Sequence, residues 1–254
     1  PAAGRRHKIG SSNMSIAREE LRIGGIPALV LGEPSNQVYL YVHGQNGNKE
    51  EACGVAESLQ RYGCQTLSLD LPGHGERADE MPFFDPWHVA PELAAVMRFA
   101  EARWKGISLF ANSIGAWFGM LGLRGKRLDR CLFVSPVLDM KRLLQKMMGW
   151  ADVSEERLRQ ERVIPTDFGQ TLSWEYWEYA ASHPITAWES PTEILYGGSD
   201  ALIDRDTVEQ FAQRFRCGLT VMENGEHWFH TQEQMDFLHR WLERSAAANG
   251  TQTR

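Results

Sequence analysis

Cysteine is scarce in this sequence of 254 residues, and no two cysteines stand at the short spacing of a redox or metal motif. A disulfide framework needs several closely spaced cysteines, and a structural zinc site needs cysteine and histidine pairs at fixed intervals. We therefore expect free thiols, no metal ion and a reducing compartment, the cytoplasm. The four cysteines are Cys53, Cys64, Cys131 and Cys217.

Basic side chains are also few and scattered, since 27 stand against 33 acidic ones and the formal net charge is −6. Binding to nucleic acid or to an anionic membrane surface needs a concentration of Lys and Arg, so we expect neither partner. One uncharged stretch, 106–123, is long enough to span a membrane. Asn112, two serines and four glycines interrupt it, which favours a buried strand that turns sharply into a helix.

The two ends of the chain lack the pattern of folded structure. Residues 1–13 contain no apolar stretch of the kind found in secretory signals. We expect them to be a disordered or artificial head, with Met14 as the natural start, and we expect 248–254 to be a frayed tail.

From residue 15 onward, short apolar runs alternate with longer amphipathic ones, which is typical of an α/β domain with a mostly parallel sheet and helices on both faces. An antiparallel pair of strands is expected within 17–31, joined at Gly24 and Gly25. Further strands are expected at 38–42, 65–69, 107–110, 131–134, 193–196 and 219–222. Helices are expected at 49–62, 86–104, 114–123, 204–216 and 231–245.

The alternation of strands and helices stops between 135 and 191. Apolar residues there recur at helical spacing, first in a Met- and Leu-rich segment at 140–148 and then in an aromatic segment at 174–179. We predict a small helical cap over 136–190, which either roofs a pocket or packs as ordinary core. It would divide a core domain into a first part at 14–135 and a second part at 191–247.

The segment ANSIG at 111–115 stands between an apolar strand and an apolar helix. A turn tight enough to lift a serine side chain clear of the backbone needs small residues two positions on either side, here Ala111 and Gly115. Such a turn leaves the Ile114 N–H at a helix N-terminus, where it stabilises a negatively charged oxygen. A serine that only caps a helix, followed by a packing glycine, fits these five residues equally well.

Three further segments place reactive groups directly after expected strands. HGQNG at 43–47 is suited to supply a backbone donor from Gln45, Asp200 follows Gly197 and Gly198, and His227 follows the last strand. Because the carboxyl ends of parallel strands meet at one edge of a sheet, we expect Ser113, Asp200 and His227 to lie together. Their order along the chain is the one used by α/β hydrolases.

On these segments the sequence resembles the α/β-hydrolase superfamily, in its esterase- and lipase-like branch, over residues 17–245. The matching pieces are HGQNG at 43–47, DLPGHG at 70–75, ANSIG at 111–115, YGGSD at 196–200 and GEHWF at 225–229. The resemblance implies that Ser113 is the nucleophile, His227 the general base and Asp200 the acid that orients it. It further implies that the backbone N–H groups of Gln45 and Ile114 form the oxyanion hole, and that a cap follows the sixth strand.

Each catalytic role has a competitor in the sequence. Asp139, after the strand at 131–134, and Asp204 are alternatives to Asp200, and His230 is an alternative to His227. We favour Asp200 because it follows its strand and its small-residue turn directly. The two histidines have no third ligand at a recognisable spacing, so we expect no metal there.

Three other residues of these matching segments also carry expectations. Ala111 departs from the family, which usually has glycine at that position, and we expect its methyl group to be accommodated. His43 and His74 are expected to hold their loops by hydrogen bonds and not to titrate in catalysis.

We predict a serine hydrolase that cleaves a carboxylic ester of a small or medium acyl substrate through an acyl-enzyme intermediate, without a cofactor. A peptidase or amidase with the same triad and a non-catalytic ligand-binding protein on this scaffold are the alternatives. A dinucleotide-binding enzyme is disfavoured, because the G-x-G at 73–75 lacks the third glycine and no phosphate-binding loop is present. Aromatic residues near the loops are candidates for an apolar pocket: Trp87, Trp117, Phe118, Trp228 and Phe229.

Overall fold

The computed structural model describes residues 15–248, so the expectations for the head, and for the tail beyond Ala248, lie outside the described residues. Its centre is an eight-stranded sheet in the order β1-β2-β4-β3-β5-β6-β9-β10. The strands are β1 (Arg18–Ile23), β2 (Ile26–Leu31), β3 (Gln37–Val42), β4 (Gln65–Leu69), β5 (Gly106–Asn112), β6 (Cys131–Val134), β9 (Thr192–Gly197) and β10 (Gly218–Met222). β2 runs antiparallel to β1 and β4, and every other pairing is parallel, which confirms the predicted sheet.

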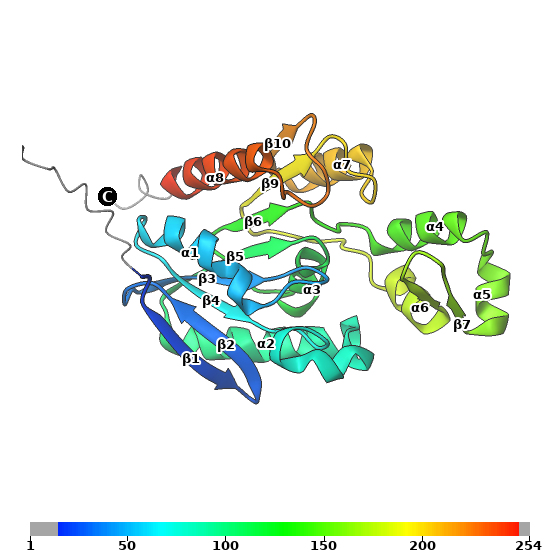
Figure 1. Cartoon of the computed structure of the whole chain (residues 1–254), viewed down its shortest axis with the longest axis horizontal. Helices are drawn as coiled ribbons and strands as arrows, with labels where there is room; N and C mark the ends of the chain where they lie inside the picture. Colours follow the sequence, from blue (N-terminus) through cyan, green and yellow to red (C-terminus); the bar gives the residue numbers. More distant parts are fainter. Residues whose placement is uncertain (1–14, 249–254) are drawn as a thin grey trace, which may run out of the picture.

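Helices cover both faces of this sheet (Figure 1). The helical elements outside 136–190 are η1 (Lys49–Ala52), α1 (Cys53–Gln60), η2 (Gly75–Phe83), α2 (Pro86–Arg103), α3 (Ile114–Gly122), α7 (Arg205–Phe215) and α8 (Gln232–Ala247). α1 and α8 pack on the face that carries Tyr41 and Phe110, and α2, α3 and α7 pack on the face that carries Leu40 and Leu109. Both faces of the central strands are therefore buried, which explains their uninterrupted apolar runs.

Residues 136–190, which we call the insertion, leave the sheet between β6 and β9. The insertion contains α4 (Met140–Trp150), α5 (Glu155–Glu161), β7 (Val163–Pro165), β8 (Thr171–Ser173) and α6 (Trp174–Ser182). Figure 1 shows α4, α5, α6 and β7 together at one end of the molecule, beyond the central strands. The insertion has a small apolar core of its own, built from Met148, Val153, Leu158, Ile164, Leu172, Trp174 and Trp177.

The expected helical cap also contains a feature that was not predicted, at 163–173, where β7 and β8 form an antiparallel hairpin. Each strand has three residues and buries one side chain, Ile164 or Leu172. Such short strands show too little alternation to be recognised from sequence. Two 3₁₀ segments also differ from expectation, because η1 replaces the start of the helix expected at 49–62 and η2 occupies an expected loop.

The uncharged run 106–123 forms β5 and α3, as predicted. Within residues 15–248, no helix is both long enough and apolar enough to cross a membrane. Gly115 makes the turn between β5 and α3 possible, because a Cβ there would lie 2.5 Å from the Val42 carbonyl oxygen and 2.6 Å from that of His43. α3 therefore starts against the carboxyl end of β3, and Ser113 lies at that edge of the sheet.

Candidate active site

Ser113 occupies the turn between β5 and α3, with φ of 50° and ψ of −120°. A residue other than glycine in such a conformation costs about 1–3 kcal/mol and persists only where its surroundings hold it. Two backbone hydrogen bonds with residues 134 and 137 contribute to this. The Ser113 N–H donates to the Val134 carbonyl at 3.0 Å, and the Val137 N–H donates to the Ser113 carbonyl at 3.0 Å.

His227 and Asp200 form a hydrogen-bonded chain with Ser113. The Ser113 Oγ lies 2.8 Å from His227 Nε2, and His227 Nδ1 lies 2.6 Å from Asp200 Oδ2. Asp200 Oδ1 accepts hydrogen bonds from the N–H groups of Leu202 and Ile203 at 2.8 and 2.9 Å. Because an ionised carboxylate only accepts hydrogen bonds, Nδ1 carries the imidazole proton and Nε2 presents its lone pair to the serine hydroxyl.

Asp200 and His227 differ in their access to solvent. The Asp200 side chain is fully buried, whereas 20% of the His227 side chain is exposed. A second glycine makes this arrangement possible, because a Cβ at Gly197 would lie 2.5 Å from the Gly225 carbonyl oxygen. The Asp200 loop and the His227 loop can therefore approach each other closely after β9 and β10.

The loop after β3 lies against Ser113. The Gly47 N–H donates to the Gly44 carbonyl at 3.1 Å, which makes a tight turn around Gln45 and Asn46. A Cβ on Gly44 would lie 3.3 Å from the Ser113 Cβ. Within residues 15–248, the backbone N–H groups of Gln45 and Ile114 donate to no protein acceptor. Both predicted oxyanion donors therefore belong to segments that meet at Ser113 in the fold.

His43 and His74 hold this loop, as predicted. His43 is fully buried; its Nδ1 donates to the Gly44 carbonyl at 2.7 Å and its Nε2 accepts from the Leu71 N–H at 3.0 Å. His74 Nε2 accepts from the Asn46 N–H at 2.9 Å. Burial lowers the pKa of His43 to about 4, so this histidine is neutral near pH 7.

A buried ion pair that was not predicted from the sequence lies beneath the loop. Lys49 Nζ lies 2.8 Å from Asp70 Oδ2, the Lys49 N–H donates to Asp70 Oδ1 at 2.8 Å, and the Glu76 N–H donates to Asp70 Oδ2 at 3.0 Å. Burial alone would raise the pKa of Asp70, but these hydrogen bonds outweigh it, and the pKa lies below its usual value. Asp70 directly after a buried strand was the available signal, since a buried carboxylate needs a partner.

The competing residues lie outside the Ser113 chain of hydrogen bonds. Asp139 caps α4 by accepting the Arg142 N–H at 3.1 Å, and Asp204 pairs with Lys146 at 2.7 Å. His230 Nδ1 donates to the Trp228 carbonyl at 2.7 Å, and its ring stacks on the Trp228 indole. Within the described part of the chain, no group of three or more His, Cys, Asp or Glu side chains is arranged to hold a metal ion.

The aromatic residues expected near the site have different roles. Phe118 and Phe229 are buried in the core, and Trp228 is 71% exposed. Trp117 is buried but also lines a cavity of about 210 Å³ between α3, α4 and α7. Trp87 contacts the rings of Tyr176 and Tyr179. Both belong to α6, in the aromatic segment predicted as part of the cap. These rings dock the insertion on the core.

One polar contact joins the insertion to the loop after β3. Gln170 Nε2, at the end of the β7–β8 loop, donates to Gln45 Oε1 at 3.2 Å. Phe168 in the same loop packs against Trp150 of α4, with ring centroids 5.7 Å apart. The hairpin loop therefore lies between α4 and the residue whose N–H is a predicted oxyanion donor.

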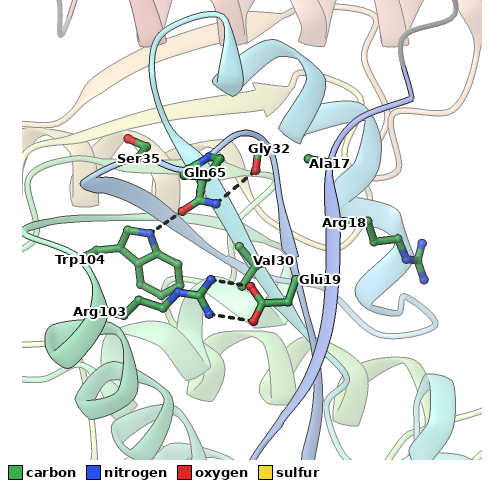
Figure 2. Close-up of a pocket in the computed structure, with 10 residues that line it drawn as sticks. Ala17, Arg18, Glu19, Val30, Gly32, Ser35, Gln65, Arg103 and Trp104 are labelled. Atoms are coloured by element: carbon green, nitrogen blue, oxygen red, sulfur yellow. Dashed lines mark hydrogen bonds and ion pairs between the residues drawn. The ribbon is translucent and has the colours of Figure 1, made fainter.

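A separate cavity of about 320 Å³ lies at the amino ends of the parallel strands (Figure 2). Gln65 at the start of β4 accepts from Trp104 Nε1 at 2.8 Å and donates to the Gly32 carbonyl at 3.2 Å, and Arg103 pairs with Glu19. Of the other polar residues that line the cavity, Arg18 pairs with Glu50 and the Ser35 hydroxyl donates to the Gly63 carbonyl. Ser113, Asp200 and His227 are not among its lining residues. It belongs to the edge of the sheet opposite the candidate site.

A family model described as alpha/beta hydrolase family matches residues 40–241, and no curated protein matches the sequence. Est1E from Butyrivibrio proteoclasticus, in a structure with ferulic acid bound, is 18% identical with a TM-score of 0.71, covering 89% of this chain and 96% of that one. Esterase Pf2001 from Pyrococcus furiosus is 17% identical with a TM-score of 0.64, covering 91% and 90%. Alpha/beta hydrolase domain-containing protein 10 from mouse is 12% identical with a TM-score of 0.74, covering 92% and 99%. At these identities the likeness to the solved structures is one of fold.

Proposed function

This chain belongs to the alpha/beta hydrolase family, and on that premise we propose that it is a serine hydrolase which cleaves a carboxylic ester of a small or medium acyl substrate through an acyl-enzyme intermediate. The observation that carries the proposal is the continuous chain of hydrogen bonds from Asp200 through His227 to Ser113. It lies beside two backbone N–H groups, of Gln45 and Ile114, that no protein acceptor within residues 15–248 uses.

The geometry supports acylation by a general-base mechanism. A serine hydroxyl is a weak nucleophile at neutral pH, so His227 Nε2, 2.8 Å away, accepts its proton as Ser113 Oγ attacks the carbonyl carbon. Asp200 holds the imidazole in the tautomer with its proton on Nδ1 and stabilises the imidazolium that forms. His227 then gives the proton to the leaving oxygen, which departs as the alcohol and leaves the acyl group on Ser113.

The tetrahedral intermediate carries its negative charge on the former carbonyl oxygen. The N–H groups of Gln45 and Ile114 are the donors proposed to stabilise it. Loss of one such donor typically costs about 10²–10³ in rate. The hydrogen bonds that His43 and His74 make to the loop hold the Gln45 donor in place before the substrate arrives.

Release of the acyl group repeats the same steps with water. His227 takes a proton from a water molecule that attacks the acyl carbon, and then returns the proton to Ser113 Oγ as the acid leaves. No cofactor enters the proposed reaction. The four cysteines are free, as expected in the cytoplasm, which we propose as the location of the protein.

The structural neighbours favour an ester over an amide as the substrate class. Est1E was solved with ferulic acid, a carboxylic acid, and Pf2001 is described as an esterase. We therefore place esters first, with a small-molecule acyl substrate as the ligand. An amidase or peptidase reaction would use the same residues and differs in the leaving group.

Hydrolysis of chromogenic acyl esters of graded chain length tests the proposal. We expect the unmodified chain to turn over the shorter esters, and Ser113→Ala to lose at least about 10³-fold in kcat/KM. Ser35→Ala is the control, because Ser35 belongs to the opposite edge of the sheet. Equal rates for Ser113→Ala and the unmodified chain would exclude the nucleophile, and turnover of aminoacyl amides alone would favour a peptidase.

A further inference from the structure

The last residue of β6 and the three residues that follow it touch both halves of the proposed catalytic pair. We call residues 134–137 the β6 corner. The Val134 carbonyl accepts from the Ser113 N–H and the Val137 N–H donates to the Ser113 carbonyl, each at 3.0 Å. The backbone of the nucleophile is thus held on both sides by this corner.

Ser135, between these two contacts, reaches the other catalytic residue. Its side-chain Oγ donates to the His227 carbonyl at 2.7 Å, across 92 positions of sequence. Its own N–H donates to the Leu195 carbonyl at 2.9 Å, which continues the ladder between β6 and β9. Because the backbone of Ser135 already has a partner in the sheet, the contact with His227 is what its hydroxyl adds.

The backbone conformation of Ser135 shows that its side chain is retained at a cost. Its φ is +47°, in the left-handed region where glycine is the ordinary residue, and the residue is 2% exposed. A glycine would adopt this conformation without strain but would leave the His227 carbonyl without the hydroxyl. The strained serine therefore points to a function for that hydroxyl.

We infer that Ser135 is a positioning residue which sets the distance between Ser113 Oγ and His227 Nε2. This inference rests on the proposed function. Asp200 holds the His227 ring at Nδ1 alone, and one hydrogen bond leaves a ring free to pivot about that atom. The Ser135 hydroxyl holds the His227 backbone as a second point. Since the same corner holds Ser113, the nucleophile and the base share one rigid support.

Two variants separate this role from a general contribution to stability. Ser135→Gly and Ser135→Ala both lose the hydroxyl, but glycine relieves the positive φ and alanine does not. We expect kcat to fall about tenfold in both, because a misplaced base transfers the proton poorly, with KM within about twofold of the unmodified chain. We expect Ser135→Gly to melt at the higher temperature of the two.

Ser190→Ala is the matched control. Ser190 is also a buried serine, 4% exposed, and its Oγ accepts the Leu128 N–H at 2.9 Å, away from the site. It should lower the melting temperature and leave kcat unchanged. Unchanged kcat in Ser135→Gly, or a kcat that follows melting temperature across all three variants, would overturn the inference. A chain that is folded but inert toward both esters and a fluorophosphonate would instead overturn the proposed function, and the inference with it.

Discussion

The carboxyl edge of the sheet and the insertion beyond it are held by different kinds of contact. At the edge, short hydrogen bonds join side chains to a fully buried carboxylate: Asp200 to His227 at 2.6 Å, and Asp70 to Lys49 at 2.8 Å. Each removes a polar group from water and leaves it with a partner, so loss of either partner is costly.

The insertion packs some apolar residues, such as Leu138 and Met140, into the main core, but the ion pairs that join it to the rest of the molecule are more exposed. Arg142 and Lys146 of α4 pair with Asp204 over side chains that are about a quarter to two fifths exposed. Such pairs contribute at most about 1 kcal/mol each. The insertion also has its own apolar core and docks through the rings of Tyr176 and Tyr179.

This difference predicts which part of the molecule tolerates amino-acid substitution. The edge requires particular atoms at particular distances, because proton transfer depends on them. The insertion can vary in sequence while its rings still pack. We therefore expect substitutions at the edge to have large effects on kcat or stability, and substitutions at exposed positions of the insertion to have small effects on KM or stability.

The largest effect is expected for Asp200→Asn. An amide in place of the carboxylate favours the wrong imidazole tautomer, so kcat should fall about 10³- to 10⁴-fold. Asp204→Asn, which removes only exposed ion pairs, should change kcat by less than about twofold. Steady-state ester hydrolysis measures both. Equal losses in the two variants would mean that the acid has been misassigned.

The next effect is the acid sensitivity of the edge. The folded pKa of His43, about 4, lies below that of an unfolded histidine, so the unfolded state binds protons first as the pH falls. His43 should have no influence above about pH 7 and should remove about 3 kcal/mol of the free energy of unfolding between pH 6.5 and 4. Urea unfolding of His43→Gln should show a correspondingly weaker pH dependence. An unchanged pH dependence would contradict the buried neutral histidine.

A pair of glycines compares the packing of the two regions. Gly115→Ala places a methyl group 2.5 Å from the Val42 carbonyl oxygen and should cost about 2–3 kcal/mol of stability. Gly149→Ala in α4 meets nothing within 4 Å and should gain about 0.5 kcal/mol through helix propensity. Thermal unfolding checks the signs. A destabilised Gly149→Ala would show that α4 is packed more tightly than the structure indicates.

The smallest effect is expected for Gln170→Ala. Loss of its exposed hydrogen bond to Gln45 should raise KM about two- to threefold and leave kcat unchanged, since the backbone donor is held from below by His43 and His74. Gln160→Ala, which removes an exposed amide of α5 bonded to Glu156, is the control. A loss in kcat would mean that the insertion helps to position the oxyanion loop.

Much of the fold and the meeting of the predicted residues followed from local sequence signals. Ser113, Asp200 and His227 each stand within a few residues of the end of a strand, and parallel strands bring their carboxyl ends to one edge. The expectation that His43 and His74 hold their loops by hydrogen bonds is also confirmed. The glycines of HGQNG and DLPGHG indicate that both histidines lie in loops.

The contacts that the sequence did not reveal join residues far apart in the chain. Ser135 and His227 are 92 positions apart, and Gln170 and Gln45 are 125 apart. A serine with positive φ has no local signature, and a hairpin of three-residue strands has no measurable alternation. The insertion was therefore predicted less accurately than the sheet.

Reaction with a fluorophosphonate probe, followed by peptide mapping, tests the central claim most directly. The probe reports an activated serine without any assumption about the natural substrate. The account predicts one adduct, on Ser113, that forms in step with the loss of ester hydrolysis and is absent from His227→Gln but present in His230→Gln. An adduct on another residue, or full ester hydrolysis with Ser113 unlabelled, would contradict it.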